Sequence, residues 1–155
     1  MAKSIENPFS VDHPKESSGF LLWQVTSLWQ RGIKKALEPH EITHSQFVLM
    51  ASIHWFALNH QEATQVALSN HTKIDPMTTS TVLRTLQQKG FIKRQEHQTD
   101  TRAKTVSLTN TGKTTIQKAV VAVEAFDKEF FSILGTNVAT INENLLVLLT
   151  NLTPK

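Results

Sequence analysis

Apolar residues recur at helical spacing in several stretches of the chain. The first stretch runs from about Phe20 to Leu37 and predicts an amphipathic helix that ends before Pro39. A second helical pattern follows Thr43, because the Thr43 hydroxyl and the Gln46 side chain can form a reciprocal capping box. The inward positions of this second helix are predicted to be Phe47, Met50, Ala51, His54 and Leu58. The chain is therefore expected to open with two helices joined by a short connection.

Two shorter helices are predicted next. The first covers about residues 63–70, with Val66 and Ala67 facing inward. The Asp75-Pro76 pair marks the start of the second, because Asp accepts a hydrogen bond from a free amide and proline needs no partner at the first helical position. This helix is expected to stop at Gly90. Two short helices with a tight connection form a helix-turn-helix arrangement.

After Gly90 the apolar pattern no longer has a helical period. Residues 91–94 and 104–108 read as two short strands, and the polar residues 96–101 between them read as a hairpin loop. A β-hairpin directly after a helix-turn-helix is a wing. The sequence therefore predicts a mainly α fold with a small β-hairpin wing.

Two long helices are predicted to close the chain, over residues 109–134 with Gly135 as C-terminal cap, and over residues 138–152. The apolar stripe of the last helix consists of Val138, Ile141, Leu145, Leu148, Leu149 and Leu152. Together with the cluster of Phe126, Phe130 and Phe131, this stripe exceeds what a small winged domain can cover. These side chains either close an intramolecular core or form a subunit interface.

Composition narrows the class of protein. The chain has 155 residues, 39% hydrophobic and 19% charged, which favours one globular domain. It has no cysteine, which excludes disulfides, thiolate zinc sites, iron–sulfur clusters and thiol redox sensors. No apolar run is long enough for a membrane span, and the polar N-terminus lacks the apolar region of a signal peptide. We therefore expect a cytoplasmic protein that does not enter a membrane.

The charge is unevenly distributed along the chain. Residues 73–118 contain nine basic and three acidic side chains, a net charge of +6, whereas the rest of the chain carries −3. Such a segment is either a solvated basic surface or a surface that meets an anion, of which nucleic acid is the usual one.

One motif is specific. Residues 100–112, DTRAKTVSLTNTG, have the pattern D-x-R followed by a strand that ends in L-T-x-x-G. The chain resembles the MarR family (multiple antibiotic resistance regulators), whose wing has this pattern. Residues 82–92, VLRTLQQKGFI, are similar to the end of the family's recognition helix, and residues 19–23 are similar to the opening of its first helix. The resemblance covers about residues 18–152.

The resemblance implies a homodimer in which the first, fifth and sixth helices of two subunits intertwine and two winged domains face one palindrome. The expected organisation is a flexible N-terminal arm over residues 1–17 and a single domain over residues 18–155. Within that domain the winged helix-turn-helix covers about residues 43–109. The helical dimerisation region covers about residues 18–38 and 110–152.

The predicted DNA-binding residues come from the recognition helix and the wing. Met77, Ser80, Thr81 and Arg84 share the helix face opposite the apolar one. From this face we predict base contacts by Ser80, Thr81 and Arg84, and a phosphate contact by Thr78. An ordinary solvated helix face is the alternative.

In the wing, the resemblance implies that Arg102 enters the minor groove, where a narrow groove favours arginine. Asp100 is expected to orient the wing, or to act only as a turn-forming residue. Lys93, Arg94 and Lys104 are expected to neutralise phosphates or to remain solvated charges.

The resemblance also implies a ligand site, because family members commonly bind small phenolic or other anionic molecules between the dimer and winged regions. Trp23, His44 and Phe47 are the candidate residues for such a site. The alternative is that these side chains are ordinary core residues. No cofactor is predicted.

A second motif points to different chemistry. Residues 40–44, HEITH, fit the H-E-x-x-H signature of zinc metalloproteases, which needs both histidines on one helix face. Here Pro39 precedes the motif and a helix is predicted to begin only at Thr43, so the two rings should not lie in register. We therefore expect no metal site and no enzyme.

The function predicted from the sequence is sequence-specific DNA binding at a pseudo-palindromic operator, as a homodimeric repressor that a ligand releases. The alternative is a protein-binding adaptor or antirepressor on the same fold. Retention of basic residues in the wing and recognition helix favours DNA.

Overall fold

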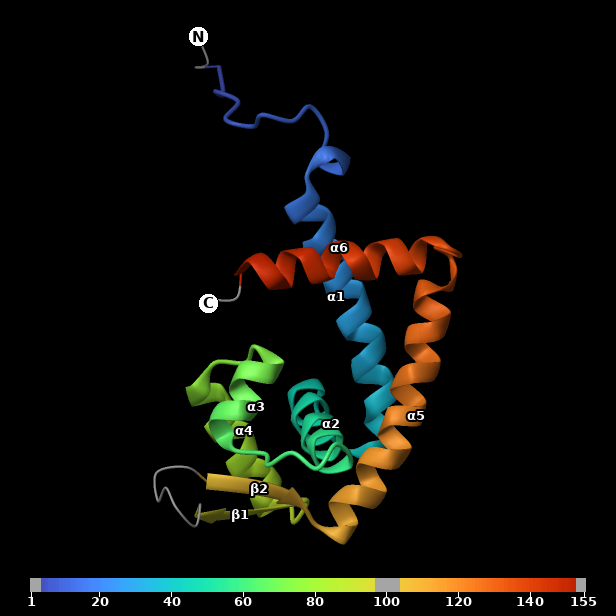
Figure 1. Cartoon of the computed structure of the whole chain (residues 1–155). Coiled ribbons are helices and arrows are strands. Elements are labelled where there is room, and N and C mark those ends of the chain that lie inside the picture. The colour runs from blue at the N-terminus through green and yellow to red at the C-terminus, as the bar shows by residue number, and fades with distance from the viewer. Residues whose placement is uncertain (1–3, 97–103, 153–155) are drawn as a thin grey trace.

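The computed structural model describes residues 4–96 and 104–152. It confirms the mainly α fold with one two-stranded antiparallel hairpin (Figure 1). The helices are α1 (Ser18–Leu37), α2 (His44–Leu58), α3 (Gln65–Thr72), α4 (Pro76–Gln88), α5 (Asn110–Ser132) and α6 (Asn137–Leu152). The strands are β1 (Ile92–Glu96) and β2 (Lys104–Leu108), and short 3-10 turns cover Pro14–Glu16 and Glu38–His40.

The elements are arranged in two regions. Helices α2, α3 and α4 and the hairpin form a lobe, which we call the winged lobe. Helix α5 leads from the hairpin past α1 to α6, and the chain bends by 107° between α5 and α6 (Figure 1). The core lies within the winged lobe and where α1 and α5 pack against it. Its largest fully buried side chains are Ile33, Leu37, Leu49, Met50, Leu68, Leu83, Leu86, Ile92, Ile116 and Thr79.

The predicted helix starts are confirmed in their hydrogen bonds. The Thr43 hydroxyl accepts from the Gln46 amide at 3.2 Å, and the Gln46 side chain accepts from the Thr43 amide at 3.0 Å, which forms the capping box. The Asp75 carboxylate accepts from the Thr78 amide at 2.8 Å, with Pro76 at the first helical position. Gly90 follows the end of α4 with a φ of 78°, a conformation that favours glycine.

The hairpin is anchored to the helices at its base. Arg94 pairs with Val106 in the antiparallel register of β1 and β2. An isolated bridge joins Thr64 to Thr105, and the Val106 amide donates to the Ala63 carbonyl at 2.7 Å. The segment before α3 therefore pairs with β2 through one isolated bridge, which fixes the hairpin to the helix-turn-helix.

Some predicted positions are wrong. Val66 does not face inward, since its side chain is 67% exposed; Leu68 and Ser69 are the buried residues of α3. Leu58 at the end of α2 is also exposed. Helix α5 ends at Ser132, and so Gly135 is not its cap but lies in the turn before α6 with a φ of 55°.

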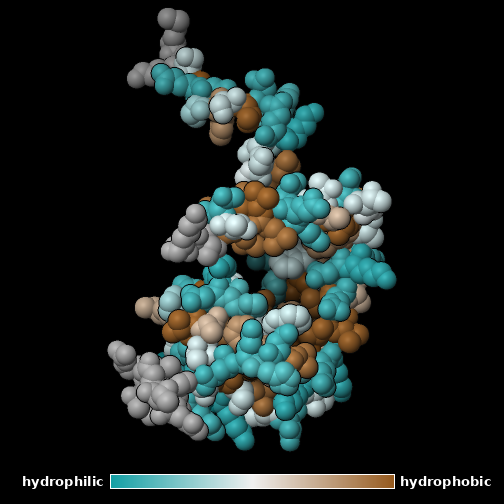
Figure 2. Space-filling model, in the orientation of Figure 1, coloured by the Kyte–Doolittle hydropathy of each residue, from teal (hydrophilic) through white to brown (hydrophobic). Residues whose placement is uncertain are grey.

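The region around α6 is exposed over much of its apolar surface. Helix α6 has no buried side chain among its described residues, and Leu145, Leu146, Val147, Leu148, Leu149 and Leu152 are all exposed. Figure 2 shows apolar side chains gathered on the visible face of α6. Four consecutive exposed residues in α1, Phe20 to Trp23, point to all sides of that helix. Within the described ranges, no single helix is long and apolar enough to cross a membrane.

Candidate nucleic-acid interface

The turn between α3 and α4 is held by side-chain hydrogen bonds. Lys73 ends α3 in the left-handed region with a φ of 63°. The buried Ser69 hydroxyl donates to the Ile74 carbonyl at 2.7 Å, and the buried Thr79 hydroxyl donates to the same carbonyl at 3.3 Å. One residue from each helix therefore fastens the connecting peptide, which fixes the orientation of α4 relative to α3.

The first turn of α4 is built around Asp75. A hydrogen bond from the Thr78 hydroxyl, together with the one from the Thr78 amide, holds the pKa of the Asp75 carboxyl below its usual value. The carboxylate thus stays ionised at the positive end of the helix dipole. Thr78 is exposed at this turn, where the sequence predicts a phosphate contact.

The outer face of α4 carries the predicted base-reading residues. Thr79, Leu83 and Leu86 are buried against the lobe, while Thr81 and Arg84 are exposed and Ser80 is half-buried. Met77 shares this outer face with Arg84, because seven residues make almost two full helical turns. Its side chain is 80% exposed. Met77 is not among the residues that the sequence predicts to contact DNA.

The two neighbouring cations of β1 differ in their surroundings. The Lys93 side chain is exposed, as is that of Lys104 on β2. The Arg94 guanidinium is half-buried and donates from Nε to Gln87 Oε1 at 2.8 Å and from an Nη to Gln65 Oε1 at 3.1 Å. Arg94 thus ties the wing to both α4 and α3, a role that no sequence pattern indicates.

The predicted wing-tip residues Asp100 and Arg102 lie outside the described residues. Their proposed contacts with DNA therefore stay predictions from the motif.

The L-T-x-x-G part of the motif forms a junction between three elements. The Thr109 hydroxyl accepts from the Gly112 amide at 3.0 Å and donates to the Gly90 carbonyl at 2.7 Å, and the Thr109 amide donates to the Phe91 carbonyl at 3.0 Å. A Cβ at Gly112 would stand 2.0 Å from the Phe91 carbonyl oxygen, and so only glycine fits there. The end of α4, the wing and the start of α5 are fastened together at this point.

Comparison with known proteins agrees with this architecture. Residues 38–125 match the family model described as ArnR1-like, winged-helix domain. The uncharacterized HTH-type transcriptional regulator YdcH of Bacillus subtilis is 40% identical over 119 residues, which are 77% of this chain and 81% of YdcH. This chain belongs to a family of winged-helix transcription regulators.

Solved structures of the MarR family have the same fold. The C80S mutant of MarR from E. coli, in a complex with operator DNA, is 27% identical, with a TM-score of 0.76 over 84% of this chain and 92% of that one. MepR of S. aureus, in a complex with DNA, is 21% identical, with a TM-score of 0.79 over 88% of this chain and 98% of that one. The MepR comparison shows the fold alone, whereas the match with E. coli MarR places this chain in the MarR family.

The H-E-x-x-H motif of this MarR-family protein does not form a zinc site. His40 ends a 3-10 turn, Glu41 has a φ of 56° in the left-handed region, and His44 begins α2. A break in the helix therefore separates the two histidines, as the sequence predicted. Among the described residues, no cluster of three or more histidine, aspartate or glutamate side chains could hold a metal ion.

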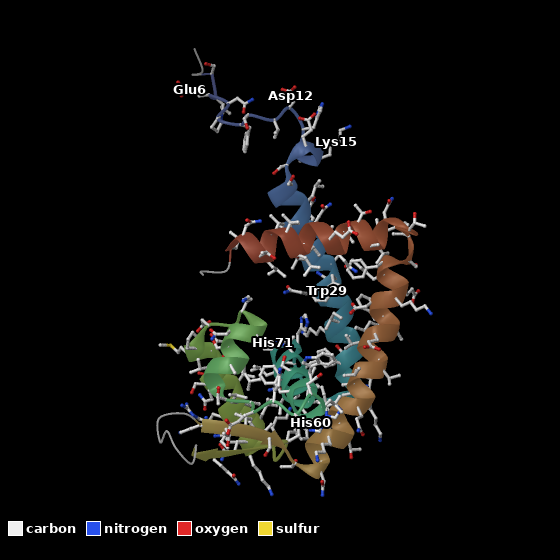
Figure 3. All side chains as sticks on the ribbon, viewed as in Figure 1. Glu6, Asp12, Lys15, Trp29, His60 and His71 are labelled. Atoms are coloured by element: carbon white, nitrogen blue, oxygen red, sulfur yellow. The ribbon has the colours of Figure 1, made fainter. Side chains whose placement is uncertain are left out.

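The candidate ligand residues are only partly brought together. A hollow of about 810 Å³ is lined by residues of α1, α2 and α3, including His44, Trp29 and Lys34. Trp23 does not line it and is 69% exposed, while Phe47 packs against the core. Trp29, which lies midway along α1 (Figure 3), takes the place predicted for Trp23.

The side chains at this hollow form a chain of contacts. The Trp29 and His44 rings meet edge to face with centroids 5.1 Å apart, and the Trp29 indole donates from Nε1 to Asp127 Oδ1 at 2.7 Å. Burial lowers the pKa of His44, and the charge of Asp127 opposes that change. The neutral imidazole is therefore favoured at this position.

Proposed function

We propose that this regulator is a homodimeric repressor that binds a pseudo-palindromic operator in the cytoplasm. The observation that supports it best is the outer face of α4, where Thr81 and Arg84 are exposed on a helix whose other face is buried. The second helix of a helix-turn-helix enters the major groove, where arginine recognises guanine. The protein acts by binding and not by catalysis.

The exposed terminal helices support the dimer. Apolar residues of α6 and of the first half of α1 form patches of the kind that mark subunit interfaces. Closed two-fold symmetry is the commonest way to cover such a patch. A two-fold dimer sets its recognition helices about 34 Å apart, one turn of DNA.

The hollow at Trp29 and His44 is the proposed ligand site. Lys34 supplies one cation to its lining, Glu38 and Glu41 supply two carboxylates, and the aromatic rings supply apolar surface, which suits a small phenolic molecule better than a strongly anionic one. Because α1 and α2 both line this hollow, a ligand there would change the angle between the terminal helices and the winged lobe. A changed separation of the two recognition helices would lower affinity for the operator.

The test is selection of DNA fragments by the purified protein, followed by affinity measurements on the selected operator. Arg102→Ala is expected to weaken binding by about 1–3 kcal/mol, the usual cost of losing one good arginine contact. The matched control is Lys128→Ala, an exposed cation on α5 far along the helix from the wing, which should leave affinity unchanged. Equal affinities of Arg102→Ala and the wild type would contradict the wing assignment.

Salt dependence separates DNA binding from the adaptor function. Several lysine and arginine contacts with phosphates from two subunits should give a steep linear fall of log K with log salt concentration. A flat dependence would instead favour a protein partner.

A further inference from the structure

Helix α4 presents an apolar side chain where a DNA reader is expected to present polar ones. The Met77 side chain is 80% exposed, and within α4, all of which is described, it is the large hydrophobic residue that is most open to solvent. It stands in the first turn, on the face that carries Arg84. A methionine is flexible and polarisable, and so it adapts to the apolar surface it meets.

Two hydroxyl groups close to Met77, those of Thr78 and Thr81, are engaged within the helix. The Thr81 hydroxyl donates to the Met77 carbonyl at 3.0 Å, and the Thr78 hydroxyl bonds the Asp75 carboxylate. A threonine hydroxyl has a single proton to donate. The outer surface of the first turn of α4 is therefore largely the apolar Met77 side chain, while Arg84 supplies donors two turns later.

In the major groove the apolar group of a base is the C5-methyl of thymine. We propose that Met77 contacts the C5-methyl of one thymine in each half-site and is a specificity-determining residue of this regulator. Arg84 reads a guanine on the same face. Seven residues of helix advance about 10.5 Å, which corresponds to about three base pairs at 3.4 Å each. This inference rests on the proposed function, since it assumes that α4 enters the major groove.

The experiment replaces thymine by deoxyuridine, which removes only the methyl group. Each thymine of the selected operator is replaced in turn, symmetrically in both half-sites, and affinity is measured by a titration. For the wild type, one position is expected to lose affinity about threefold or more, the scale for one buried methyl group. For Met77→Ala, the same replacement should have no effect, because the contacting side chain is absent.

Gln88→Ala is the matched control, because Gln88 is an exposed residue at the other end of the same helix face. This variant should keep the response to deoxyuridine at the position that Met77 contacts, whatever its overall affinity. Circular dichroism and sedimentation check that each variant keeps the helical content and the assembly of the wild type.

Two results would overturn the inference. In one, every thymine is replaceable in the wild type without loss of affinity; in the other, Met77→Ala keeps the wild-type response. Both leave the proposed function intact, since an operator has been selected. If no DNA sequence is selected at all, the proposed function fails and this inference fails with it.

Discussion

The winged lobe and the terminal helices differ in how completely they bury their own apolar residues. In the lobe, Leu83 and Leu86 of α4 are fully buried, and even polar groups such as Ser69 have partners inside the lobe. In α6, no described side chain is buried, although leucine is its commonest residue. The lobe thus buries its core within one chain, whereas the terminal helices expose the apolar surface that the proposed second copy would cover.

The largest expected effect comes from placing a charge in the α6 stripe. Leu148→Glu should break the dimer, because a carboxylate cannot be buried without a partner. It should abolish operator binding although no DNA-facing residue changes. Sedimentation at micromolar concentration and an operator titration measure the two effects.

The control for this change is Thr150→Glu, which adds the same charge on the opposite side of the same helix. It should leave the dimer intact. A wild-type protein that sediments as a monomer of 17.4 kDa and still binds a palindrome tightly would contradict the proposed role of the terminal helices in dimerisation.

The next largest effect is expected inside the lobe. Leu83→Ala should lower the free energy of unfolding by about 2–5 kcal/mol, since Leu83 is fully buried and its truncation leaves a cavity. This loss should be the same at low and high protein concentration, unlike that of an interface variant. Denaturant unfolding at two concentrations checks it, and a loss that depends on concentration would show that the lobe too relies on a partner.

A smaller effect should distinguish the role of Arg94 from that of Lys93, the two neighbouring cations of β1. Arg94→Gln removes hydrogen bonds with Gln87 and Gln65 and should destabilise the fold by about 1–2 kcal/mol. Lys93→Gln should leave stability within about 0.5 kcal/mol of the wild type but reduce the salt slope of DNA binding by about one for each subunit. The reverse pattern would mean that Arg94 contacts phosphate and Lys93 supports the fold.

The smallest effect concerns the contact between the two regions, where His44 of the lobe meets Trp29 of α1. Because burial lowers the pKa of His44 in the folded state, the unfolded state binds the proton more readily. Burial of the neutral His44 ring stabilises the fold fully at pH values above the usual histidine pKa of about 6.5. This stabilisation is lost as the pH falls through the lower pKa that His44 has in the folded state. Denaturant unfolding as a function of pH should show this loss, and His44→Phe should reduce it.

Features that depend on adjacent residues could be predicted from the sequence. The capping box at Thr43, the Asp75-Pro76 start, the stop at Gly90 and the hairpin all follow from local hydrogen bonds and backbone preferences. The polar face of α4 could be predicted as well, because a helix of thirteen residues has enough turns for its apolar positions to define the buried side.

Features that depend on contacts between distant residues could not be predicted. Helix α3 has only eight residues, too few for its periodicity to decide whether Val66 or Leu68 faces inward. Trp23 and Trp29 stand on one helix, and only packing against α5 decides which turn of α1 meets the lobe. The sequence gives no sign that Arg94 differs from an ordinary surface cation, because its partner Gln65 is far away in the sequence.

Thr109 fixes the start of α5 relative to the winged lobe. Because it joins the end of α4, the wing and the first turn of α5 by three hydrogen bonds, we expect these parts to keep a fixed arrangement. The 23 residues of α5 extend about 35 Å from this pivot. At that length, each degree of tilt about Thr109 displaces the far end by about 0.6 Å. In the proposed dimer, contacts between a partner subunit and the far end of α5 would therefore restrict the tilt of the whole winged lobe.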